Sequence, residues 1–439
     1  METASPCIIC CNRALCYNAL AMRIRVAIET LGCKLNQAES ETLARQFIAV
    51  GCEVVPPGEK ADVYILNTCT VTHIADRKSR HLLRMAKRLN PAALTVATGC
   101  YANRSDTELW GMADLELIVR NEDKDSLPEI IAQRLGAAGS AERNDSGLRT
   151  RAFIKAQDGC NRRCAYCIVP LVRGREKSLP ADEVINEINA RVTDGYKEVV
   201  LTGTEIGSYS FDGLNIKGLL GRVLDETDIE RLRVSSLQPY EITPELLSLW
   251  KNPRLCPHFH ISLQSGSDSM LTRMKRGYTA ASYEKAIRFI RESLPEAAVT
   301  TDIIVGFPGE TDAECHESWD FCRRTGFARI HVFPYSARPG TAAAVMPGQV
   351  KAQVKKERAG AMLALAKESA GLFRSRFLGQ TMPVLWEQKS NAGIWGGYTS
   401  NYIRVYTRDE TDLINIISET SLLKIYKDGV WGELVGHKE

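Results

Sequence analysis

The sequence predicts an α/β protein with three parts: a parallel-sheet α/β domain, a six-strand partial (β/α) barrel and a small all-β barrel. After Met22, short β-rich runs alternate with helical patterns, as in parallel βαβ units. The same alternation resumes near Thr150 and continues through six further candidate strands. From Phe377 onward, short alternating runs follow, around Met382–Gln388, Asn401–Tyr406 and Leu413–Ser418. We therefore expect domains over residues 23–140, 146–376 and 377–437.

We expect residues 1–22 to be a disordered leader or not part of the native protein. This segment opens with Glu2 and lacks a basic region, and Cys and Asn interrupt its apolar runs, so it is a poor signal peptide. A metal site is the alternative, because four cysteines crowd the segment. They are Cys7, Cys10, Cys11 and Cys16.

The composition is that of an ordinary globular protein, with one exception. The chain of 439 residues is 44% hydrophobic and 25% charged, and its formal charge of +3 is too small to indicate nucleic-acid binding by itself. No apolar run approaches the roughly 18–20 residues that span a bilayer, so no membrane partner is expected. The exception is cysteine, with 14 residues. Because a reducing cytosol keeps thiols free, we expect a cytoplasmic protein whose cysteines include metal ligands.

In the first domain, a cysteine follows each of three predicted strands. Carboxyl ends of parallel strands meet at one sheet edge, so these thiols are expected to converge on an iron–sulfur cluster or zinc. The alternative is three unrelated buried core residues, of the kind that Cys52 illustrates by preceding a strand. A helix is expected from Gln37 to Val50. The strands and cysteines are Arg25–Thr30 with Cys33, Asp62–Asn67 with Cys69, and Leu94–Thr98 with Cys100.

The helix predicted between the second and third of these strands is strongly basic. Such a run is usually a solvated face, and the alternative is a surface that contacts phosphates and binds more weakly at high salt. Its basic residues are Arg77, Lys78, Arg80, His81, Arg84, Lys87 and Arg88.

The second domain begins with a compact cysteine loop. A predicted strand, Ala152–Gln157, leads into Cys160, Cys164 and Cys167, with spacings of three and two residues. Structural zinc normally takes four ligands in paired C-x-x-C hooks, so this pattern fits zinc poorly. Iron in a cluster usually has four cysteine ligands in total, and three would leave one iron open to a small molecule.

The remaining barrel strands each end in a polar or glycine-bearing turn. Barrel active sites are built from such loops, so these turns are candidate ligands of a small molecule. The predicted strands are Glu198–Leu201, Leu232–Ser235, Phe259–Leu263, Val299–Val305 and Ala328–Phe333.

The Cys160-x3-Cys164-x2-Cys167 loop resembles the signature of radical S-adenosylmethionine (SAM) enzymes. The resemblance implies that SAM chelates the open iron of a [4Fe-4S] cluster and that its cleavage yields a 5′-deoxyadenosyl radical. It also implies that Tyr166 lies near the SAM adenine. By the same resemblance, Gly203, Thr204 and Glu205 stand at the amino-group motif, and Ser236 and Gln264 at ribose-contacting positions.

Nearly the whole chain from Ile24 resembles the methylthiotransferase family, with three cysteines before the loop and a tail similar to an RNA-contacting TRAM domain. Several aromatic and basic tail residues suit RNA binding, although some must form the barrel's own core. Asn103 departs from the family pattern, where glutamine is expected. The tail residues are Trp386, Lys389, Trp395, Tyr398, Tyr402, Arg404 and Tyr406.

Local motifs resemble the branch that modifies threonylcarbamoyladenosine. This implies methylthiolation of carbon 2 of N6-threonylcarbamoyladenosine in the tRNA anticodon loop, next to the anticodon, with two SAM per turnover and two [4Fe-4S] clusters. It also implies an electron donor such as flavodoxin or ferredoxin. Alternatives are isopentenyladenosine in tRNA, a ribosomal-protein aspartate, a non-catalytic iron–sulfur RNA-binding protein and a zinc-binding regulatory module. The motifs are Thr30–Gln37, Asn67–Thr72, Asp76–Arg80, His258–Gly266 and Phe333–Ser336.

Overall fold

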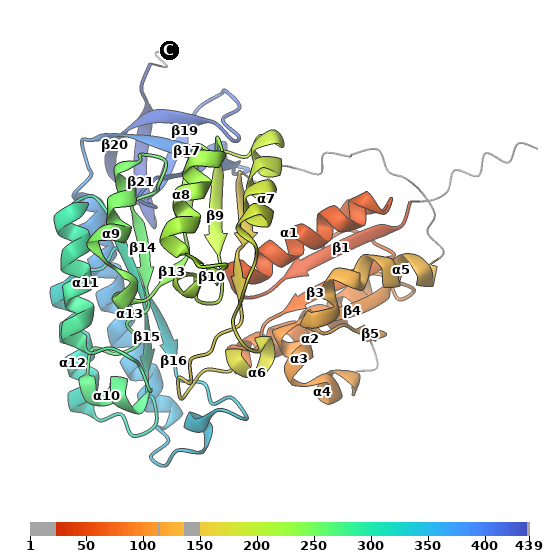
Figure 1. Cartoon of the computed structure of the whole chain (residues 1–439), viewed down its shortest axis with the longest axis horizontal. Helices are drawn as coiled ribbons and strands as arrows, with labels where there is room; N and C mark the ends of the chain where they lie inside the picture. Colours follow the sequence, from red (N-terminus) through yellow and green to blue (C-terminus); the bar gives the residue numbers. More distant parts are fainter. Residues whose placement is uncertain (1–22, 112–114, 136–149, 437–439) are drawn as a thin grey trace, which may run out of the picture.

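The computed structural model describes residues 23–111, 115–135 and 150–436, so the expected leader with its four cysteines lies outside the described residues (Figure 1). The predicted α/β class is confirmed: a parallel N-terminal sheet, a second set of parallel strands wrapped by helices, and a closed C-terminal barrel. None of the helices in the described ranges is long and apolar enough to cross a membrane.

The N-terminal sheet is parallel and has the order β2-β1-β3-β4-β5. Its central strand, β3, is buried along its whole length, as expected for a parallel sheet covered on both faces. Val26, Ile65 and Val96 of the three inner strands pack in one apolar core. The strands are β1 (Arg25–Thr30), β2 (Glu53–Val55), β3 (Val63–Thr68), β4 (Leu94–Gly99) and β5 (Leu117–Ile118). The helices are α1 (Lys34–Ala49), α2 (His73–Leu89), α3 (Cys100–Arg104), α4 (Asp106–Trp110) and α5 (Leu127–Leu135), with a 3-10 turn at Asn121–Ser126.

Helix α1 begins at Lys34, three residues before the predicted start at Gln37. The reason is Asn36, whose side-chain amide donates to the carbonyls of Leu31 (2.7 Å) and Thr68 (3.0 Å). These bonds tie the first helical turn to the ends of two strands. Cys33 is therefore the residue that immediately precedes the helix.

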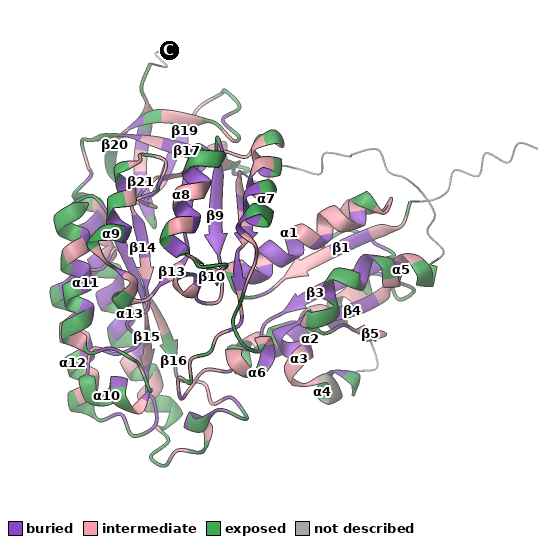
Figure 2. Ribbon diagram, in the orientation of Figure 1, coloured by how far each residue is buried: buried purple, intermediate pink, exposed green. Residues whose placement is uncertain are grey.

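The second domain is a six-strand partial barrel, as predicted, with sheet orders β6-β9-β12 and β13-β14-β15-β16. All these strand pairs are parallel, and β13 continues the chain one residue after β12. Figure 2 shows buried strands inside helices whose outer faces are exposed. The strands are β6 (Arg151–Lys155), β9 (Glu198–Thr202), β12 (Arg231–Val234), β13 (Ser236–Leu237), β14 (His258–Ile261), β15 (Ala298–Val305) and β16 (Arg329–Pro334). The helices are α6 (Val169–Arg173), α7 (Ala181–Thr193), α8 (Ile216–Glu226), α9 (Pro244–Leu247), α10 (Asp268–Arg273), α11 (Ala280–Ser293), α12 (Asp312–Thr325) and α13 (Ala352–Ser375).

The C-terminal strands close into a barrel of order β17-β18-β19-β21-β20. The predicted run Leu413–Ser418 is wrong: Asn415 has a positive φ of 58° in a turn, and the strand starts at Ile417. Strand β18 was not predicted because glycine disfavours strands. Here a Cβ on Gly397 would lie 2.5 Å from the Leu385 carbonyl oxygen, so glycine permits the close approach of β17. The strands are β17 (Thr381–Lys389), β18 (Ile394–Thr399), β19 (Arg404–Arg408), β20 (Ile417–Tyr426) and β21 (Gly429–Leu434).

This closed barrel covers the end of the partial barrel where its strands begin. Arg233 forms a buried bidentate ion pair with Glu198 (2.8 and 3.1 Å) and donates to the Ser400 carbonyl (2.9 Å). The Tyr402 hydroxyl accepts a hydrogen bond from Arg151 (3.0 Å), and its ring stacks on His258, 4.7 Å between centroids. The opposite end, where the strands finish, carries the cysteine loop.

Candidate active site

The three N-terminal cysteines all lie at the carboxyl edge of the first sheet. Cys33 follows β1, Cys69 follows β3, and Cys100 directly follows β4 as the first residue of α3. The hydroxyl of Thr68 accepts hydrogen bonds from the backbone of Tyr101 (3.2 Å) and Ala102 (3.3 Å), which places the start of α3 beside the end of β3. Cys69 and Cys100 are buried, whereas Cys33 is exposed.

These thiols influence one another electrostatically. Burial, and then the neighbouring thiols of Cys100 and Cys33, raise the pKa of Cys69 to about 12. Cys52 differs, because it precedes β2 and packs in the apolar core with Phe47 and Val63. Cys322 likewise lies in the apolar core of the second domain.

The cysteine loop, Cys160–Cys167, is held in a compact shape by backbone hydrogen bonds. The amide of Cys167 donates to the Cys164 carbonyl (3.1 Å), and the amide of Ala165 donates to Met274 (2.9 Å). Burial raises the pKa of Cys160 to about 12 and that of Cys167 to about 11. Three thiols thus lie on one compact loop at the carboxyl end of the barrel.

Glu205, a candidate SAM residue, lies directly against this loop. One of its carboxylate oxygens accepts from the Cys160 thiol (3.2 Å), while the other accepts from Arg162 (2.5 Å) and Tyr240 (2.7 Å). The side chain is only 3% exposed, so these donors replace water around a buried carboxylate. Sequence reasoning missed Tyr240, which stands in a turn without a cysteine or glycine signal.

Arg276 is a second residue that the sequence did not identify. Its guanidinium lies 3.3 Å from the Cys164 sulfur and 3.5 Å from the hydroxyl of Tyr166, and it donates to Gln238 (2.6 Å). It therefore places a positive charge beside both a cysteine thiol and the tyrosine predicted to lie near the adenine. Arg276 lies more than 100 residues from the loop along the chain, so no local sequence pattern indicates that it contacts the cysteines.

The other candidate SAM residues lie at strand ends but contact the loop less directly. Thr204 donates to Asp158 (3.2 Å), and a Cβ on Gly203 would lie 2.8 Å from the Gln157 amide oxygen. Ser236 pairs with His260 in the sheet, and Gln264 has a positive φ of 68°. Among the described residues, neither Ser236 nor Gln264 hydrogen-bonds to the cysteine loop. Their role at the ribose stays a prediction.

The two cysteine triplets are joined by the contact of α3 with α6. Cys100 packs with Ile168 and Val172, which belong to the segment following Cys167, in one small apolar cluster. Asn103, the departure from the family pattern, donates to the Val172 carbonyl (3.0 Å) and accepts from the Asn121 amide (2.7 Å). Asparagine at this position therefore forms part of the link between the domains.

Arg173, the last residue of α6, extends this link to helix α1. Its side chain is 3% exposed and donates to Asn36 (2.6 Å), Glu39 (2.9 Å) and Asp158 (3.0 Å). Lys124 also pairs with Glu39 (2.5 Å). A buried ionic network thus holds the first domain against the cysteine loop.

The donor sets fit iron–sulfur clusters. Each triplet offers three thiols and an adjacent positive charge: Arg173 and Lys124 act on Cys100, and Arg276 acts on Cys167. These cations offset the negative charge that thiolate ligands bring to a buried site. Cluster ligation by Cys33, Cys69, Cys100, Cys160, Cys164 and Cys167 remains a prediction.

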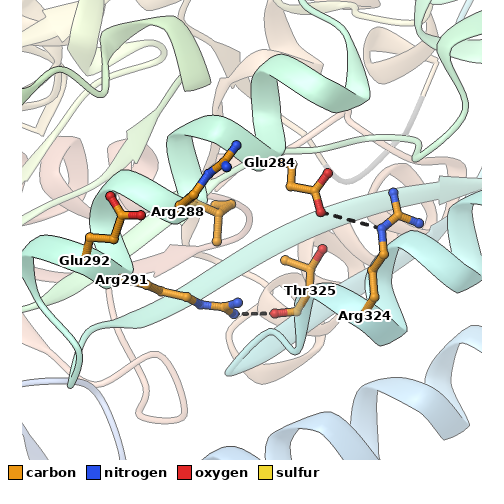
Figure 3. Close-up of a pocket in the computed structure, with 7 residues that line it drawn as sticks. Glu284, Arg288, Arg291, Glu292, Arg324 and Thr325 are labelled. Carbon is orange, nitrogen blue, oxygen red and sulfur yellow. Dashed lines mark hydrogen bonds and ion pairs between the residues drawn. The ribbon is translucent and has the colours of Figure 1, made fainter.

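A surface pocket between α11 and α12 is separate from the candidate active site (Figure 3). Glu284 and Arg324 form an ion pair across it (3.7 Å), and Arg291 donates to the Thr325 carbonyl. None of its lining residues belongs to either cysteine triplet or to the candidate SAM residues. The pocket is a groove between helices of the outer layer.

Gly99→Ala is expected to remove the first cysteine site while leaving the second intact. Gly99 has φ 94° and ψ −168°, a conformation nearly restricted to glycine, which costs other residues about 1–3 kcal/mol. A Cβ there would also lie 2.5 Å from the Thr68 carbonyl oxygen, so the backbone before Cys100 must move. Iron content after anaerobic reconstitution should fall by about half. Gly58→Ala is the control, since a Cβ on Gly58 meets nothing within 4 Å, and it should retain all its iron.

The fold and the cysteine loop define an enzyme of the radical SAM class. Residues 154–322 match the "Radical SAM superfamily", and residues 25–119 match the "Uncharacterized protein family UPF0004". A radical SAM methyltransferase from Kitasatospora setae, TsrM, solved with cobalamin and a [4Fe-4S] cluster, has a similar fold, with a TM-score of 0.55. It is 17% identical, over 74% of this chain and 77% of its own.

Full-length relatives specify the family. The chain is 35% identical to "Threonylcarbamoyladenosine tRNA methylthiotransferase MtaB" of Bacillus subtilis (strain 168), over 93% of this chain and 97% of the relative. It is 37% identical to the protein of that name in Aquifex aeolicus (strain VF5), over 87% of this chain and 96% of the relative. The chain belongs to the methylthiotransferase family of radical SAM enzymes, in the threonylcarbamoyladenosine branch. Its cofactors are SAM and [4Fe-4S] clusters.

Proposed function

We propose that this enzyme transfers a methylthio group to carbon 2 of N6-threonylcarbamoyladenosine, next to the anticodon in tRNA. The observation that carries the proposal is the α3–α6 contact, which brings two separate cysteine triplets to one region between two domains. The names of the full-length relatives support the same substrate. Carbon 2 of adenine carries an unactivated C–H bond, so a radical route suits the chemistry better than a general base.

Within this mechanism, the protein's residues hold and orient the reactants. When bound, the clusters and SAM supply the electron, the radical and the sulfur. Cys160, Cys164 and Cys167 hold one cluster, and Cys33, Cys69 and Cys100 hold the other. Glu205 and Arg276 stand beside the first set, where a carboxylate and a guanidinium suit the amino and carboxylate groups of SAM. The buried ionic network around Arg173 holds the two cysteine sites in a fixed position relative to each other.

Helix α2 is proposed as part of the tRNA-binding surface. Five of its basic side chains are exposed: Arg77, Lys78, His81, Arg84 and Arg88. The other two are engaged, Arg80 with Tyr101 and Glu108, and Lys87 with Glu116. In the C-terminal barrel, Trp386 and Trp395 belong to the core, which leaves more exposed residues such as Lys389 and Arg404 for RNA. The enzyme is proposed to work in the cytoplasm with flavodoxin or ferredoxin as electron donor.

Nucleoside analysis of tRNA tests this proposal. Reconstituted enzyme, SAM and a reductant are incubated anaerobically with tRNA carrying threonylcarbamoyladenosine, and the digest is examined by mass spectrometry. The expected product is the 2-methylthio derivative, together with 5′-deoxyadenosine. Parallel reactions with isopentenyladenosine tRNA and with ribosomal protein should give no methylthio product. Modification of either of these in place of the first substrate would contradict the proposal.

Replacing Arg77, Lys78 and Arg84 together with glutamine is expected to weaken tRNA binding and to lower its salt dependence. On duplex nucleic acid, each phosphate contact contributes about −0.9 to the slope of log K for binding against log salt concentration. Loss of three contacts should therefore reduce the magnitude of the slope by about two to three. Filter binding at several salt concentrations measures this. An unchanged slope would mean that α2 lies outside the RNA interface.

A further inference from the structure

A polar layer inside the partial barrel has no role in the steps described above. His260 of β14, Asp302 of β15 and His331 of β16 come from three adjacent strands, and one ligand-type atom of each lies within 4.8 Å of the others. His260 Nε2 lies 3.1 Å from an Asp302 oxygen, and Asp302 and His331 are direct partners in the sheet register.

Strand β14 places this layer between the Tyr402 end of the barrel and the cysteine loop. His258, His260 and Ser262 alternate along β14 and its continuation, so their side chains share one face. His258 stacks on Tyr402, while the Ser262 hydroxyl donates to Asp302 (2.7 Å). The Ser262 carbonyl accepts from Arg276 (3.5 Å), the same arginine that contacts Cys164.

Lys34 brings a positive charge to this space from the first domain. It follows Cys33 directly and is half-buried. On the same face of α1, about two and three turns further on, Glu41 accepts from the Phe153 amide (3.1 Å) and Arg45 pairs with Asp194 (2.7 Å), so this face lies against the second domain. Burial, Arg233 and then Lys34 lower the pKa of His258, in agreement with this placement. Among the described residues, no hydrogen bond or ion pair engages Lys34, and Glu198 is paired with Arg233.

These groups suit an anionic, hydrogen-bonding ligand better than a metal ion. Both ring nitrogens of His260 are already engaged, with Thr300 (2.9 Å) and Asp302, and the positive charge of Lys34 opposes a second cation. An anion would neutralise Lys34, while Asp302 could accept from N–H or O–H groups. An apolar ligand would leave the Lys34 ammonium without a partner, at a cost of desolvation.

We propose that Lys34 and the layer of His260, Asp302 and His331 bind the N6 substituent of the substrate adenosine and select threonylcarbamoyl over an apolar group. This rests on the proposed function. The Lys34 ammonium pairs with the threonyl carboxylate, and Asp302 accepts a hydrogen bond from the ureido N–H or the hydroxyl. A site built to bind polar groups strongly rejects analogues that lack them, which gives selectivity against isopentenyladenosine.

A Lys34→Met variant, assayed on two anticodon stem-loop RNAs, tests this assignment. One RNA carries threonylcarbamoyladenosine, and the other carries its carboxyl methyl ester, which lacks the negative charge. For the wild-type enzyme, kcat/KM should be about 100-fold lower on the ester. Lys34→Met should lose about 100-fold on the acid and show little difference between the two RNAs. Lys217→Met, at an exposed lysine of α8, should behave as the wild type.

Iron content and the SAM-perturbed electron paramagnetic resonance signal are measured in each variant, because Lys34 adjoins Cys33. A Lys34→Met enzyme that keeps its iron but retains the full preference for the acid overturns the proposal. Asp302→Asn is a second variant, away from the cysteines, and should lower kcat/KM on both RNAs about tenfold; wild-type kcat/KM would contradict the assignment of Asp302. Absence of product from the wild-type enzyme on the acid RNA would instead refute the proposed function.

Discussion

The Cys69→Ala variant is expected to make no methylthiolated nucleoside while still cleaving SAM to 5′-deoxyadenosine. Cys69 belongs to the triplet on the N-terminal sheet, whereas the triplet predicted to bind SAM through a cluster lies on the separate loop Cys160–Cys167. Loss of Cys69 therefore removes the proposed sulfur-donating site and leaves the electron-transfer site in place. Mass spectrometry of the nucleosides and of 5′-deoxyadenosine measures both outcomes in one reaction.

Two further variants control this experiment. Cys164→Ala should abolish both products, because it removes a ligand of the cluster predicted to bind SAM. Cys52→Ala changes a buried cysteine in the apolar core of the same N-terminal domain, and it should keep both activities. Methylthiolated product from Cys69→Ala would show that the assignment of two clusters is wrong.

Arg173→Met is expected to destabilise the protein and to uncouple SAM cleavage from methylthiolation. Removal of one partner from a buried ion pair costs about 3–5 kcal/mol, because the remaining charge stays buried. Of its two ion-pair partners, Glu39 would keep only Lys124, and α6 would lose its hydrogen bond to Asn36. Thermal unfolding of the reconstituted enzyme and the ratio of 5′-deoxyadenosine to product measure the two effects.

Arg45→Met is a matched control for this variant. Arg45 also joins α1 to the second domain, by an ion pair with Asp194 (2.7 Å), but both side chains are about one-third exposed (34% and 33%). Exposed pairs contribute about 0–1 kcal/mol, so stability should hardly change. Equal effects of the two substitutions would show that burial of the Arg173 network is not what links the domains.

The Arg173 network also predicts how stability depends on pH. Burial alone would raise the pKa of Glu39, but Lys124 and Arg173 hold it well below its ordinary value of 4.5. Since the folded pKa is depressed, this contribution to stability is fully present above pH 4.5 and is lost as the pH falls through the folded pKa. Arg173→Met should therefore differ most from the wild type near neutral pH and less in strong acid. A constant difference across pH 3 to 7 would contradict this coupling.

The cysteine spacing and strand patterns predicted much of the molecule because each is a local signal. Alternating β-rich and helical runs located the parallel strands, and the positions of Cys33, Cys69 and Cys100 after strands placed them at one edge. Strand β18 escaped prediction, since Gly397 disfavours a strand by itself and is required only because β17 approaches closely.

The site residues that sequence reasoning missed are defined by contacts between segments far apart in the sequence. Arg276 and Tyr240 reach the cysteine loop from other barrel segments, and Lys34 lies on the face of α1 that packs against the second domain. No short stretch of sequence predicts these long-range contacts, because they result from the packing of whole helices and strands. The sequence therefore indicated the two cysteine triplets better than the residues around them.

Iron and sulfide content of the anaerobically reconstituted enzyme, combined with electron paramagnetic resonance of the reduced protein, tests the central claim of two cluster sites. We predict about eight irons per chain, as two four-iron clusters require, and a signal that SAM perturbs. Content of about four irons would remove the site at Cys33, Cys69 and Cys100, and with it the proposed methylthiolation. Zinc in place of iron would contradict the whole account.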